Sequence, residues 1–367
     1  MKKKRDHKVK NYRKHMGKIL VSDDFVLFRP KVGYRVNSNS VLVKNSENAG
    51  FIFECAPNSA LSIDLIKRYM KEQEIDFNYI KFIIISHAHQ DHYANLKKYQ
   101  ISFPKAKTIT HANDLSSLRY PFLLPKTWKS GLRYKGFNKN SIRIYSSIYI
   151  LLNHFYFNSL QRANQIDFSF KEDLNLSKFW EAFPNLNDQV KEKDLDITLL
   201  HTPGHSPGHT CVIDAHKNLF VADLVPFTPW CCPVVEGINQ MISSIKKILS
   251  FSNKEIKRIV KSHGDIRRSP HFRWEIVPYE IEKPKYQFFL DSIYRTLEKI
   301  PQKIKGKEAD LEYICALFNP NFAKYSKLMK AVFIPPAISW AIAYALKLEK
   351  EGKIRRIIKK NQIYWTS

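Results

Sequence analysis

Short apolar runs separated by turn residues dominate the first part of the chain. Three of these runs, ILVSDDFVLFRP (19–30), YRVNSNSVLVKN (34–45) and GFIFECAP (50–57), predict strands. The stretch SALSIDLIKRYMKEQEI (59–75) carries its apolar residues at helical spacing and predicts a helix. YIKFIIIS (79–86) contains a short apolar run without alternation and is rich in β-branched residues, which predicts a buried strand.

Helix and strand signals alternate further along the chain. A helix is expected from DHYANLKKYQISF (91–103), and AKTITHANDLSSL (106–118) predicts a strand followed by a helix. Strands and tight turns return in residues 195–225, an amphipathic helix in 237–251 and a further strand in 256–265. This alternation predicts an α/β fold, in which functional sites gather beyond the carboxyl ends of the strands.

Other segments depart from this pattern and suggest domain limits. Residues 1–18 are basic and are expected to form an N-terminal arm, followed by a domain over 19–283. Within that domain, about 115–192 is aromatic and basic and predicts a mostly helical insertion. Residues 284–367 predict a C-terminal domain of helices, which ends in a helix, a stop at Gly352 and a two-stranded ribbon.

Composition allows a large core but leaves the partner open. The chain has 367 residues, of which 44% are hydrophobic, with 24 Phe and 18 Tyr. Its net charge of +26 fits a polyanionic partner such as RNA, DNA or an anionic membrane face. It fits equally well a lysine-rich composition with no specific partner, because net charge reports on association rather than on fold.

Cysteine content and hydropathy indicate a cytoplasmic protein without a membrane span. The basic start lacks the apolar core of a signal peptide, and the longest apolar stretch, 331–346, is short and broken by Pro335 and Pro336. An odd, small number of cysteines with no Cys-x-x-Cys pair predicts a reducing compartment. The five are Cys55, Cys211, Cys231, Cys232 and Cys315.

A cluster of histidines follows the strand predicted at 79–86. His87, His89 and His92 lie within six positions, with Asp91 among them. Directly past a strand, His87 and His89 can point to one side and hold one ion. Asp91 and His92, at the turn into the next helix, can face a second ion. Imidazole and carboxylate groups are ligands that Zn²⁺ accepts.

Three more ligand-capable residues follow apolar strands in the second half of the chain. His205 lies in the Pro- and Gly-rich turn of LLHTPGHSPGHT, Asp223 ends the strand of LFVADLV, and His263 ends that of IVKSHGD. Each alone is a weak signal. Together with the first cluster they supply five histidines and two aspartates, a full set for two ions with a position open to water.

In these motifs and their order the chain resembles the metallo-β-lactamase superfamily, over about residues 19–270. The resemblance implies a four-layer αββα sandwich of the α/β class with the site on one edge. It also implies a ligand set for two ions. The implied ligands are His87, His89 and His205 for the first ion, Asp91, His92 and His263 for the second, and Asp223 as a bridge.

The chemistry expected of this ligand set is metal-dependent hydrolysis. Two ions about 3.5–4 Å apart can share a water and lower its pKa to about neutral, so that a hydroxide attacks a carbonyl or phosphorus centre. Asp91 would both bind metal and accept a hydrogen bond from this nucleophile, which makes it the candidate catalytic residue. His201 and His209 flank His205 and could orient the ligands, although a structural role is the simpler expectation.

One position departs from the family pattern. Members usually carry an aspartate at the end of an early strand, often followed by Thr-Gly. Here the stretch FIFECAPNS places Glu54 or Cys55 at that point. That aspartate usually contacts a metal ligand from the side away from the ions. Whether this chain has such a contact is left open by the sequence.

The His-Thr-Pro-Gly-His motif is typical of compact members such as glyoxalase II-like thioesterases and lactonases. We therefore expect a binuclear zinc hydrolase, with iron or manganese as alternatives, acting on a small thioester, lactone or related ester. VADLVPFTPWCCPVV (221–235) lacks the continuation typical of glyoxalase II, so no glutathione site is expected. The aromatic insertion could cover the site as a lid for a bulky substrate or pack against the sandwich.

The end of the chain, LKLEKEGKIRRIIKKNQIYW (346–365), is similar to the last helix and wing of a winged-helix unit, as in the lactamase-β-like branch. It carries seven basic residues: Lys347, Lys350, Lys353, Arg355, Arg356, Lys359 and Lys360. They could bind RNA phosphates in a metal-dependent endoribonuclease. The favoured alternative is that the tail covers the active-site side or forms a homodimer contact. A nucleic-acid-binding protein with a structural metal is less expected, because structural zinc sites favour closed, Cys-rich sets.

Overall fold

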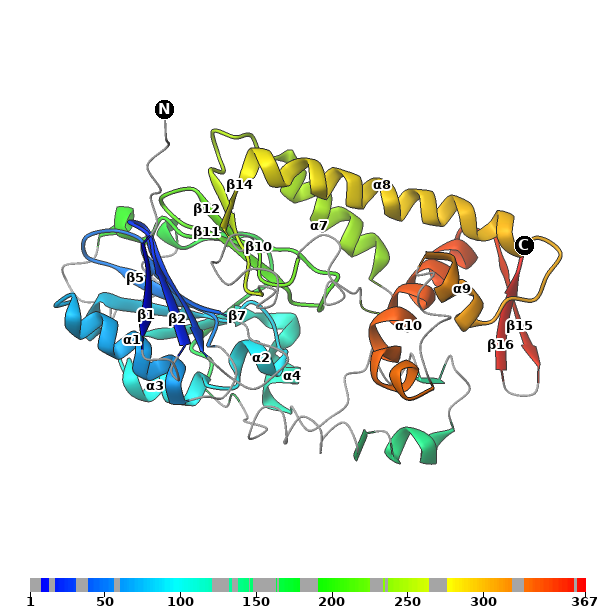
Figure 1. The fold of residues 1–367 in the computed structure, drawn as a ribbon, viewed down its shortest axis with the longest axis horizontal. Coiled ribbons are helices and arrows are strands. Elements are labelled where there is room, and N and C mark those ends of the chain that lie inside the picture. Colours follow the sequence, from blue (N-terminus) through cyan, green and yellow to red (C-terminus); the bar gives the residue numbers. More distant parts are fainter. Residues whose placement is uncertain are drawn as a thin grey trace.

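The structure is a computed structural model, drawn as a ribbon in Figure 1. It describes residues 8–12, 17–30, 39–55, 60–120, 132–133, 138–144, 146–147, 163, 165–178, 191–224, 234, 237–263, 276–318, 327–359 and 362–367.

The first sheet contains eight strands, which follow one another in the order of the chain. Strands β1 to β5 pair antiparallel, and β5 to β8 pair parallel because helices connect them. The strands are β1 Lys8–Tyr12, β2 Gly17–Val21, β3 Phe25–Pro30, β4 Ser40–Lys44, β5 Gly50–Phe53, β6 Ile80–Ile84, β7 Lys107–His111 and β8 Phe168–Phe170.

The second sheet has six strands in the order β14-β13-β12-β11-β10-β9. All neighbours pair antiparallel except β12 and β13, which are parallel and are connected through a helix. The strands are β9 Leu174–Asn175, β10 Thr198–His201, β11 Thr210–Ile213, β12 Asn218–Phe220, β13 Arg258–Val260 and β14 Ile276–Pro278.

Alternate side chains of the buried strands enter two different cores. In β5, Phe51 and Phe53 join the core between the two sheets, whereas Ile52 packs with the helices outside the first sheet. Because successive side chains of a strand point to opposite faces, a strand covered on both faces is apolar at every position. The same division holds for β6 and the residue after it, and it explains the unbroken apolar run of residues 82–85.

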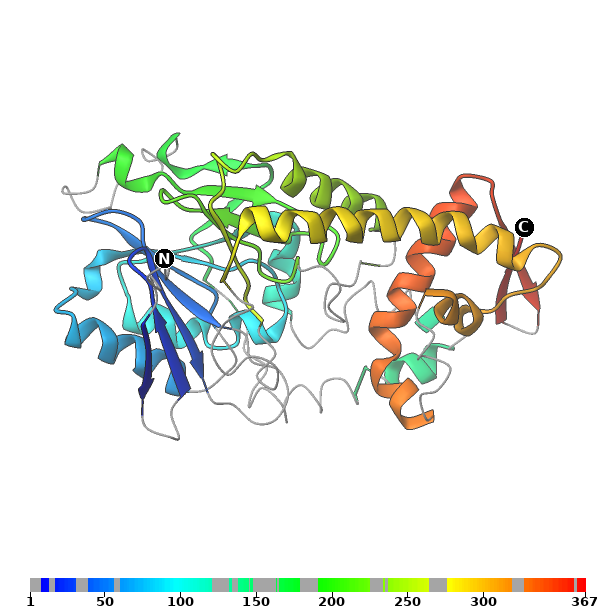
Figure 2. The same ribbon diagram turned by 45° about the horizontal axis from the view of Figure 1, so that its top comes forward.

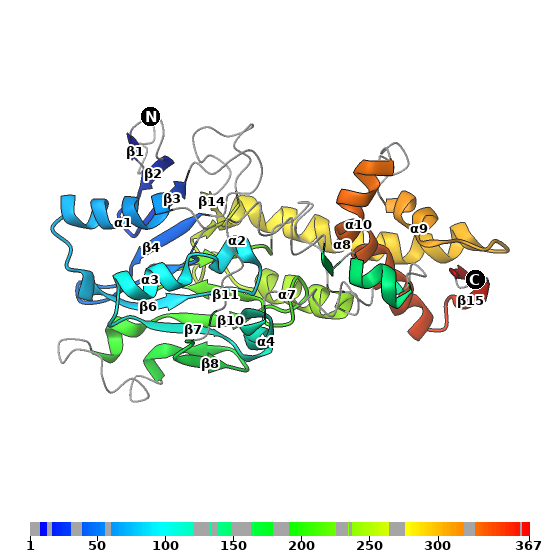
Figure 3. The same cartoon turned by 90° about the horizontal axis from the view of Figure 1, so that it is seen from below.

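Helices cover the outer face of each sheet, so the fold has the predicted four layers (Figure 1). Figure 3 looks onto the first sheet from its outer side, where α1 and α3 lie over it. The first sheet is covered by α1 Ala60–Glu72, α2 Gln90–Tyr93 and α3 Leu96–Ser102, and the second by α7 Ile238–Ser250 and the first part of α8 Tyr279–Ile304. Short helices lie at connections: η1 Phe77–Tyr79, η2 Ala112–Asp114, α4 Leu115–Arg119 and η4 Glu192–Leu195.

A C-terminal helical domain follows the sandwich, at the far end of α8 (Figure 2). Helix α8 has 26 residues and is therefore about 39 Å long. The domain continues with α9 Leu311–Phe318, α10 Lys327–Lys350 and a ribbon of β15 Arg355–Lys359 and β16 Gln362–Thr366. A single bridge between Ala309 and Trp365 ties the ribbon to the segment before α9.

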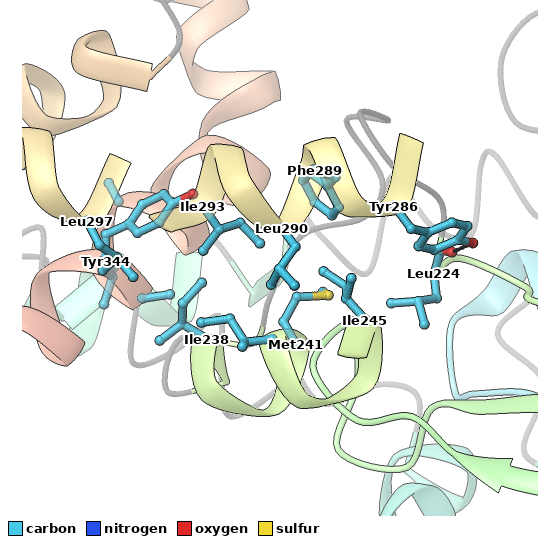
Figure 4. Close-up of a cluster of buried hydrophobic side chains, with 14 of the residues drawn as sticks. Leu224, Ile238, Met241, Ile245, Tyr286, Phe289, Leu290, Ile293, Leu297 and Tyr344 are labelled. Carbon is cyan, nitrogen blue, oxygen red and sulfur yellow. Dashed lines mark hydrogen bonds between the residues drawn. The ribbon is translucent and has the colours of Figure 1, made fainter. Parts of the chain in front are cut away.

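One apolar core joins this domain to the sandwich. Figure 4 shows Met241 and Ile245 of α7 facing Leu290 of α8, with Tyr344 of α10 at the other end of the same cluster. All four side chains are buried. Full burial of a large apolar side chain contributes about 1.5–3 kcal/mol, so this core fixes the C-terminal helices against α7.

The structure refines the predicted segment limits in two places. Residues 8–12, expected within the basic arm, form the edge strand β1, whose lysine-rich sequence is typical of an exposed sheet edge. Strands β8 and β9 lie within the predicted insertion and complete the two sheets. Residues 139–144 of the insertion are helical, as expected, but most of the segment lies outside the described residues.

The predicted boundary after residue 283 falls inside α8, which is continuous there. Of the helices described, none combines the length and the hydropathy that crossing a bilayer requires.

Candidate metal centre

The seven predicted ligands meet at one edge of the sandwich, beyond the carboxyl ends of four strands. The segment after β6 carries four of them, His87 and His89 in the loop and Asp91 and His92 on α2, and β10, β12 and β13 each precede one more. Those three strands run in the same direction, because β10 and β12 both pair antiparallel with β11, and β12 pairs parallel with β13. The backbone N–H of Thr210 donates to the carbonyl of Ser86 at 2.9 Å and joins the two sheets at this edge.

Four residues form the first ligand group: His87, His89, His205 and Asp223. Nδ1 of His89 lies 2.9 Å from Nε2 of both His87 and His205, and those two Nε2 atoms are 3.2 Å apart. Oδ2 of Asp223 lies 3.2 Å from Nε2 of His205. Ligand atoms about 2.0–2.1 Å from one tetrahedral ion are about 3.3 Å apart, so this spacing fits a single ion such as Zn²⁺.

Three residues form the second ligand group: Asp91, His92 and His263. The Nε2 atoms of His92 and His263 are 3.1 Å apart. Oδ2 of Asp91 lies 3.5 Å from Nε2 of His92 and 3.3 Å from Nε2 of His263. These separations fit a second ion by the same criterion.

Asp223 connects the two groups. Its Oδ1 lies 3.4 Å from Nε2 of His92 and 3.1 Å from Nε2 of His263, while its Oδ2 faces the first ligand group. The structure thus brings together all seven predicted residues, in the grouping that the resemblance implied. Three of the seven residues are partly exposed: His89 in the first ligand group, and Asp91 and His263 in the second, whose side chains are 14% and 15% exposed. Solvent therefore reaches both ligand groups.

Comparison with known proteins agrees with this geometry. The sequence model of the Metallo-beta-lactamase superfamily matches residues 33–230, more than half of the chain. The chain belongs to the metallo-β-lactamase superfamily. The match includes every candidate ligand except His263, which the fold adds to the site. A search among curated proteins found no match.

Solved structures of superfamily proteins share the fold over nearly the whole chain. A metallo-beta-lactamase family protein from Thermus thermophilus aligns with a TM-score of 0.60 at 13% identity, covering 94% of this chain and 98% of that one. A beta-lactamase domain protein from Burkholderia ambifaria aligns with a TM-score of 0.62 at 12% identity, covering 96% and 94%. At this coverage the shared fold includes the C-terminal helices.

Burial keeps two histidines in the first ligand group of this superfamily member, His87 and His89, neutral. Desolvation lowers the pKa of His87 well below its usual value and that of His89 to about 3, with the neighbouring imidazoles acting in the same direction. Metal binding requires the neutral imidazole, so these two side chains are already in the binding form.

The second ligand group is charged. Burial opposes protonation of His263, but the carboxylates of Asp223 and Asp91 outweigh it and raise the pKa of His263 to about 9. Burial also opposes protonation of His92, yet Glu54, Asp223 and Asp91 raise its pKa well above the usual value. The cluster of carboxylates thus attracts positive charge, and a divalent cation could replace the two imidazole protons.

Glu54 resolves the departure seen in the sequence. Its Oε2 accepts a hydrogen bond from Nδ1 of His92 at 2.8 Å, and its Oε1 accepts one from the N–H of Ser86 at 3.2 Å. The side chain is fully buried, and its backbone φ is +69°. Glu54 therefore binds His92 on the side away from the centre, and Nε2 of His92 faces the centre.

Asp114 is a supporting residue that the sequence analysis missed. Its carboxylate accepts hydrogen bonds from the N–H of Ala88 at 3.1 Å, the hydroxyl of Ser206 at 2.7 Å and the N–H of Gly208 at 2.9 Å. This buried side chain therefore ties the loop of His87 and His89 to the turn of His205. The only sequence signal is its place just past β7, and a helix N-cap produces the same signal.

Two glycines let the turn after β10 approach its neighbours. Gly204 has φ +138°, and a Cβ there would lie 2.7 Å from Cα of Met241 in α7. A Cβ on Gly208 would lie 2.8 Å from Cγ of Asp114. Both positions therefore require glycine, and the turn is fixed between α7 and Asp114.

The two histidines that flank His205 have different roles. His209 is buried, and its Nε2 accepts the N–H of Asp223 at 3.3 Å while Nδ1 bonds to the hydroxyl of Thr202 at 2.9 Å. It supports the bridging aspartate through the backbone. His201 stacks on His111 at 3.8 Å between ring centroids and donates to the carbonyl of Pro207, so it does not contact the ligands through these bonds.

Proposed function

We propose that this chain is a hydrolase that holds two divalent ions and acts on a carbonyl substrate, a thioester, lactone or related ester. One observation carries the proposal: the two carboxylate oxygens of Asp223 face two separate sets of ligand atoms. A site for one ion has no need of such an arrangement. The geometry therefore favours a bridged pair of ions.

Each residue has a part in the proposed centre. His87, His89 and His205 hold the first ion, Asp91, His92 and His263 hold the second, and Asp223 bridges them. Ions bound there, zinc in the first place and iron or manganese as alternatives, supply Lewis acidity and lower the pKa of a bound water to about 7.

Asp91 is the proposed catalytic residue. Its carboxylate is partly exposed, whereas His87 and His92 are fully buried. Asp91 can therefore accept a hydrogen bond from a water molecule that arrives from solvent and orient it for attack. The buried histidines exclude bulk water from the opposite side of the centre.

The choice of a carbonyl substrate over RNA rests on the turn that holds His205 and on the C-terminal domain. The sequence HTPGH (201–205) is typical of the thioesterase and lactonase members of the superfamily. In a winged-helix unit, the helix before the ribbon would enter a nucleic-acid groove. Here the second half of that helix, α10, is buried against other helices through Ala341, Ile342 and Ala345.

Ion pairs also reduce the charge of the proposed RNA-binding tail. Four of its basic residues pair with glutamates: Lys347 and Lys353 with Glu351, Arg356 with Glu349 and Lys359 with Glu308. We therefore propose that the tail supports the fold and that the substrate is a small molecule. A metal-dependent endoribonuclease is the alternative. A cytoplasmic location and a homodimer are further proposals.

The test is metal analysis combined with a substrate screen. We expect protein purified without added metal to contain two divalent ions per chain and to hydrolyse at least one thioester, lactone or ester. In the variant Asp223→Ala we expect the ion content to fall toward zero. Turnover should drop more than about 100-fold, because loss of a residue that only hydrogen-bonds to a metal ligand already costs about 10–100-fold.

The control is His216→Gln. His216 lies in the turn between β11 and β12, at the end of the second sheet opposite the candidate centre. The variant should keep both ions and full turnover. RNA cleavage without turnover of any carbonyl substrate would support the endoribonuclease instead. Protein that takes up no divalent ion would refute both functions.

A further inference from the structure

Helix α8 contacts two of the strand ends that carry proposed ligands. Tyr286 is fully buried on α8, and its hydroxyl donates to the carbonyl of Leu224 at 2.5 Å. Leu224 directly follows Asp223. Figure 4 shows the Tyr286 ring beside Leu224 at one end of the core between α7 and α8.

The second contact is a buried ion pair. Nζ of Lys261, two residues before His263, lies 2.6 Å from Oε1 of Glu282 on α8. Glu282 is 1% exposed and Lys261 is 7% exposed. The other carboxylate oxygen of Glu282 accepts Nζ of Lys285 at 2.8 Å. A buried ion pair adds little net stability but fixes the geometry of the groups that it joins.

Glu282 and Tyr286 are four residues apart and therefore lie on the same face of α8. Directly before His263, Ser262 is fixed from the first sheet, since its carbonyl accepts the N–H of Asn39 at 2.8 Å. Strands β12 and β13 are hydrogen-bonded to each other as far as Val221 and Val260, and the two contacts of α8 fix the backbones beyond that point. The separation of these backbones decides whether Oδ1 of Asp223 and Nε2 of His263 can reach one ion.

We propose that Glu282 and Tyr286 are positioning residues for the second ion. They act through Lys261 and Leu224 and do not contact the ion themselves. This inference rests on the proposed function, because it assumes that the second ligand group holds a metal. The loop of His87 and His89 is held instead by Ser86 and Asp114. Of the first ligand group, only the shared Asp223 follows a strand end that α8 contacts, so the first ion should depend on α8 less than the second.

The test uses a matched pair of tyrosines. Tyr279, like Tyr286, is a fully buried residue of α8 whose hydroxyl donates to a backbone carbonyl at 2.5 Å. Its nearer acceptor, Ile248, lies near the end of α7, and a second carbonyl, that of Phe251, lies 3.1 Å away directly after α7. Both acceptors are away from the ligands. Tyr279→Phe and Tyr286→Phe therefore remove the same kind of bond from the same helix, and only Tyr286→Phe removes it next to a ligand.

The measurement is calorimetric titration of metal-free protein with Zn²⁺, with Co²⁺ absorption spectra as a second readout. We expect Tyr286→Phe and Glu282→Gln to weaken binding of the second ion about 10-fold and to change its Co²⁺ spectrum. Binding of the first ion should weaken by less than about 3-fold, because it shares only Asp223 with the affected strand ends. Tyr279→Phe should leave both ions unchanged, although thermal unfolding shows a similar loss of stability for both tyrosine variants.

The remaining outcomes separate this inference from the proposed function. If the wild type binds two ions and no variant changes the second, α8 has no positioning role and the hydrolase proposal stands. If Tyr279→Phe weakens the second ion as much as Tyr286→Phe does, the effect is general stability and the inference is wrong. A wild type that binds no ion overturns both.

Discussion

The two halves of the candidate centre are built in different ways. Four ligand residues, from His87 to His92, come from the loop after β6 and from α2, and they are held by residues of the first sheet and its loops, such as Glu54 and Asp114. The other three come from the ends of three strands, and helices α7 and α8 fix those ends. The first half is therefore organised by polar contacts within its own sheet and loops, and we call it the local half. The second depends on helices that pack on the outside of its sheet, and we call it the distant half.

This difference has a consequence for which substitutions matter. In the local half, loss of one buried acceptor leaves several hydrogen-bond donors unsatisfied at once. In the distant half, the support is spread over two helices, and loss of one contact shifts a backbone without exposing the ligands. We therefore expect larger effects from changes in the local half.

The largest effect should come from Asp114, where the halves meet. Asp114→Ala leaves the donors of Ala88, Ser206 and Gly208 without their acceptor. Unsatisfied buried groups cost about 1–3 kcal/mol each, so we expect unfolding to become easier by about 3 kcal/mol. Affinity for the first ion should fall at least about 10-fold. Chemical denaturation and Zn²⁺ titration measure both.

Asp76→Ala provides the control for Asp114, because Asp76 caps a surface turn with a single bond to the N–H of Asn78. It should cost less than about 1 kcal/mol and leave metal binding unchanged. If Asp114→Ala costs no more than Asp76→Ala, the link between the two ligand loops has no energetic importance.

An intermediate effect is expected from Glu54, inside the local half. Glu54→Gln keeps the shape of the side chain, but its amide can satisfy only one of the two donors, Nδ1 of His92 and the N–H of Ser86. We expect the second ion to bind about 10-fold more weakly, while the first ion changes by less than about 3-fold. Isothermal titration with Zn²⁺ resolves the two steps.

Glu74→Gln is the matched control for Glu54. Glu74 also has a positive φ, of +53°, but it is exposed in the turn after α1. Equal effects of the two variants on Zn²⁺ binding would show that the contact to His92 does not orient this ligand.

The smallest effect on the centre is expected from Asp214, in the turn between β11 and β12 at the end of the second sheet opposite the centre. Burial raises the pKa of Asp214 to about 6, above the value of about 4 in an unfolded chain. The folded state therefore binds this proton more tightly. The stability gained from protonation of Asp214 is fully present below about pH 4 and is lost as the pH rises through about 6.

Asp214→Asn removes this titration. We expect the stability of the variant relative to the wild type to rise by about 2 kcal/mol between pH 4 and pH 7.5, with no change in metal content. Denaturation curves at a series of pH values test this. A relative stability that is flat across this range would mean that the carboxyl is not destabilised by burial.

The sequence was sufficient to predict the two sheets, the four layers and the residues that meet at the edge. Ligand side chains at the ends of apolar strands are visible in one sequence, because the strand and the ligand are neighbours along the chain. Strands β8 and β9 were missed because three and two residues are too few to show a period. β1 was missed because its charge is typical of an unstructured arm as well as of an edge strand.

The supporting residues could not be predicted in the same way. Asp114, Glu282 and Tyr286 act on segments 21 or more positions away in the sequence, and nothing in their own neighbourhood marks them. Glu282 and Tyr286 belong to an ordinary amphipathic helix, and their partners are known only once α8 is packed across the second sheet. Glu54 was noticed as a departure, but its bond to His92 depends on the pairing of β5 with β6.

The unbroken course of α8 also limits how the protein can be shortened. A fragment cut after residue 283 would contain all seven ligands and would look sufficient for catalysis. It would nevertheless retain Glu282 while discarding Tyr286 four residues later, together with most of the helix that buries the back of the second sheet. The smallest active fragment of this chain is therefore expected to extend well beyond the segment that carries the seven ligands.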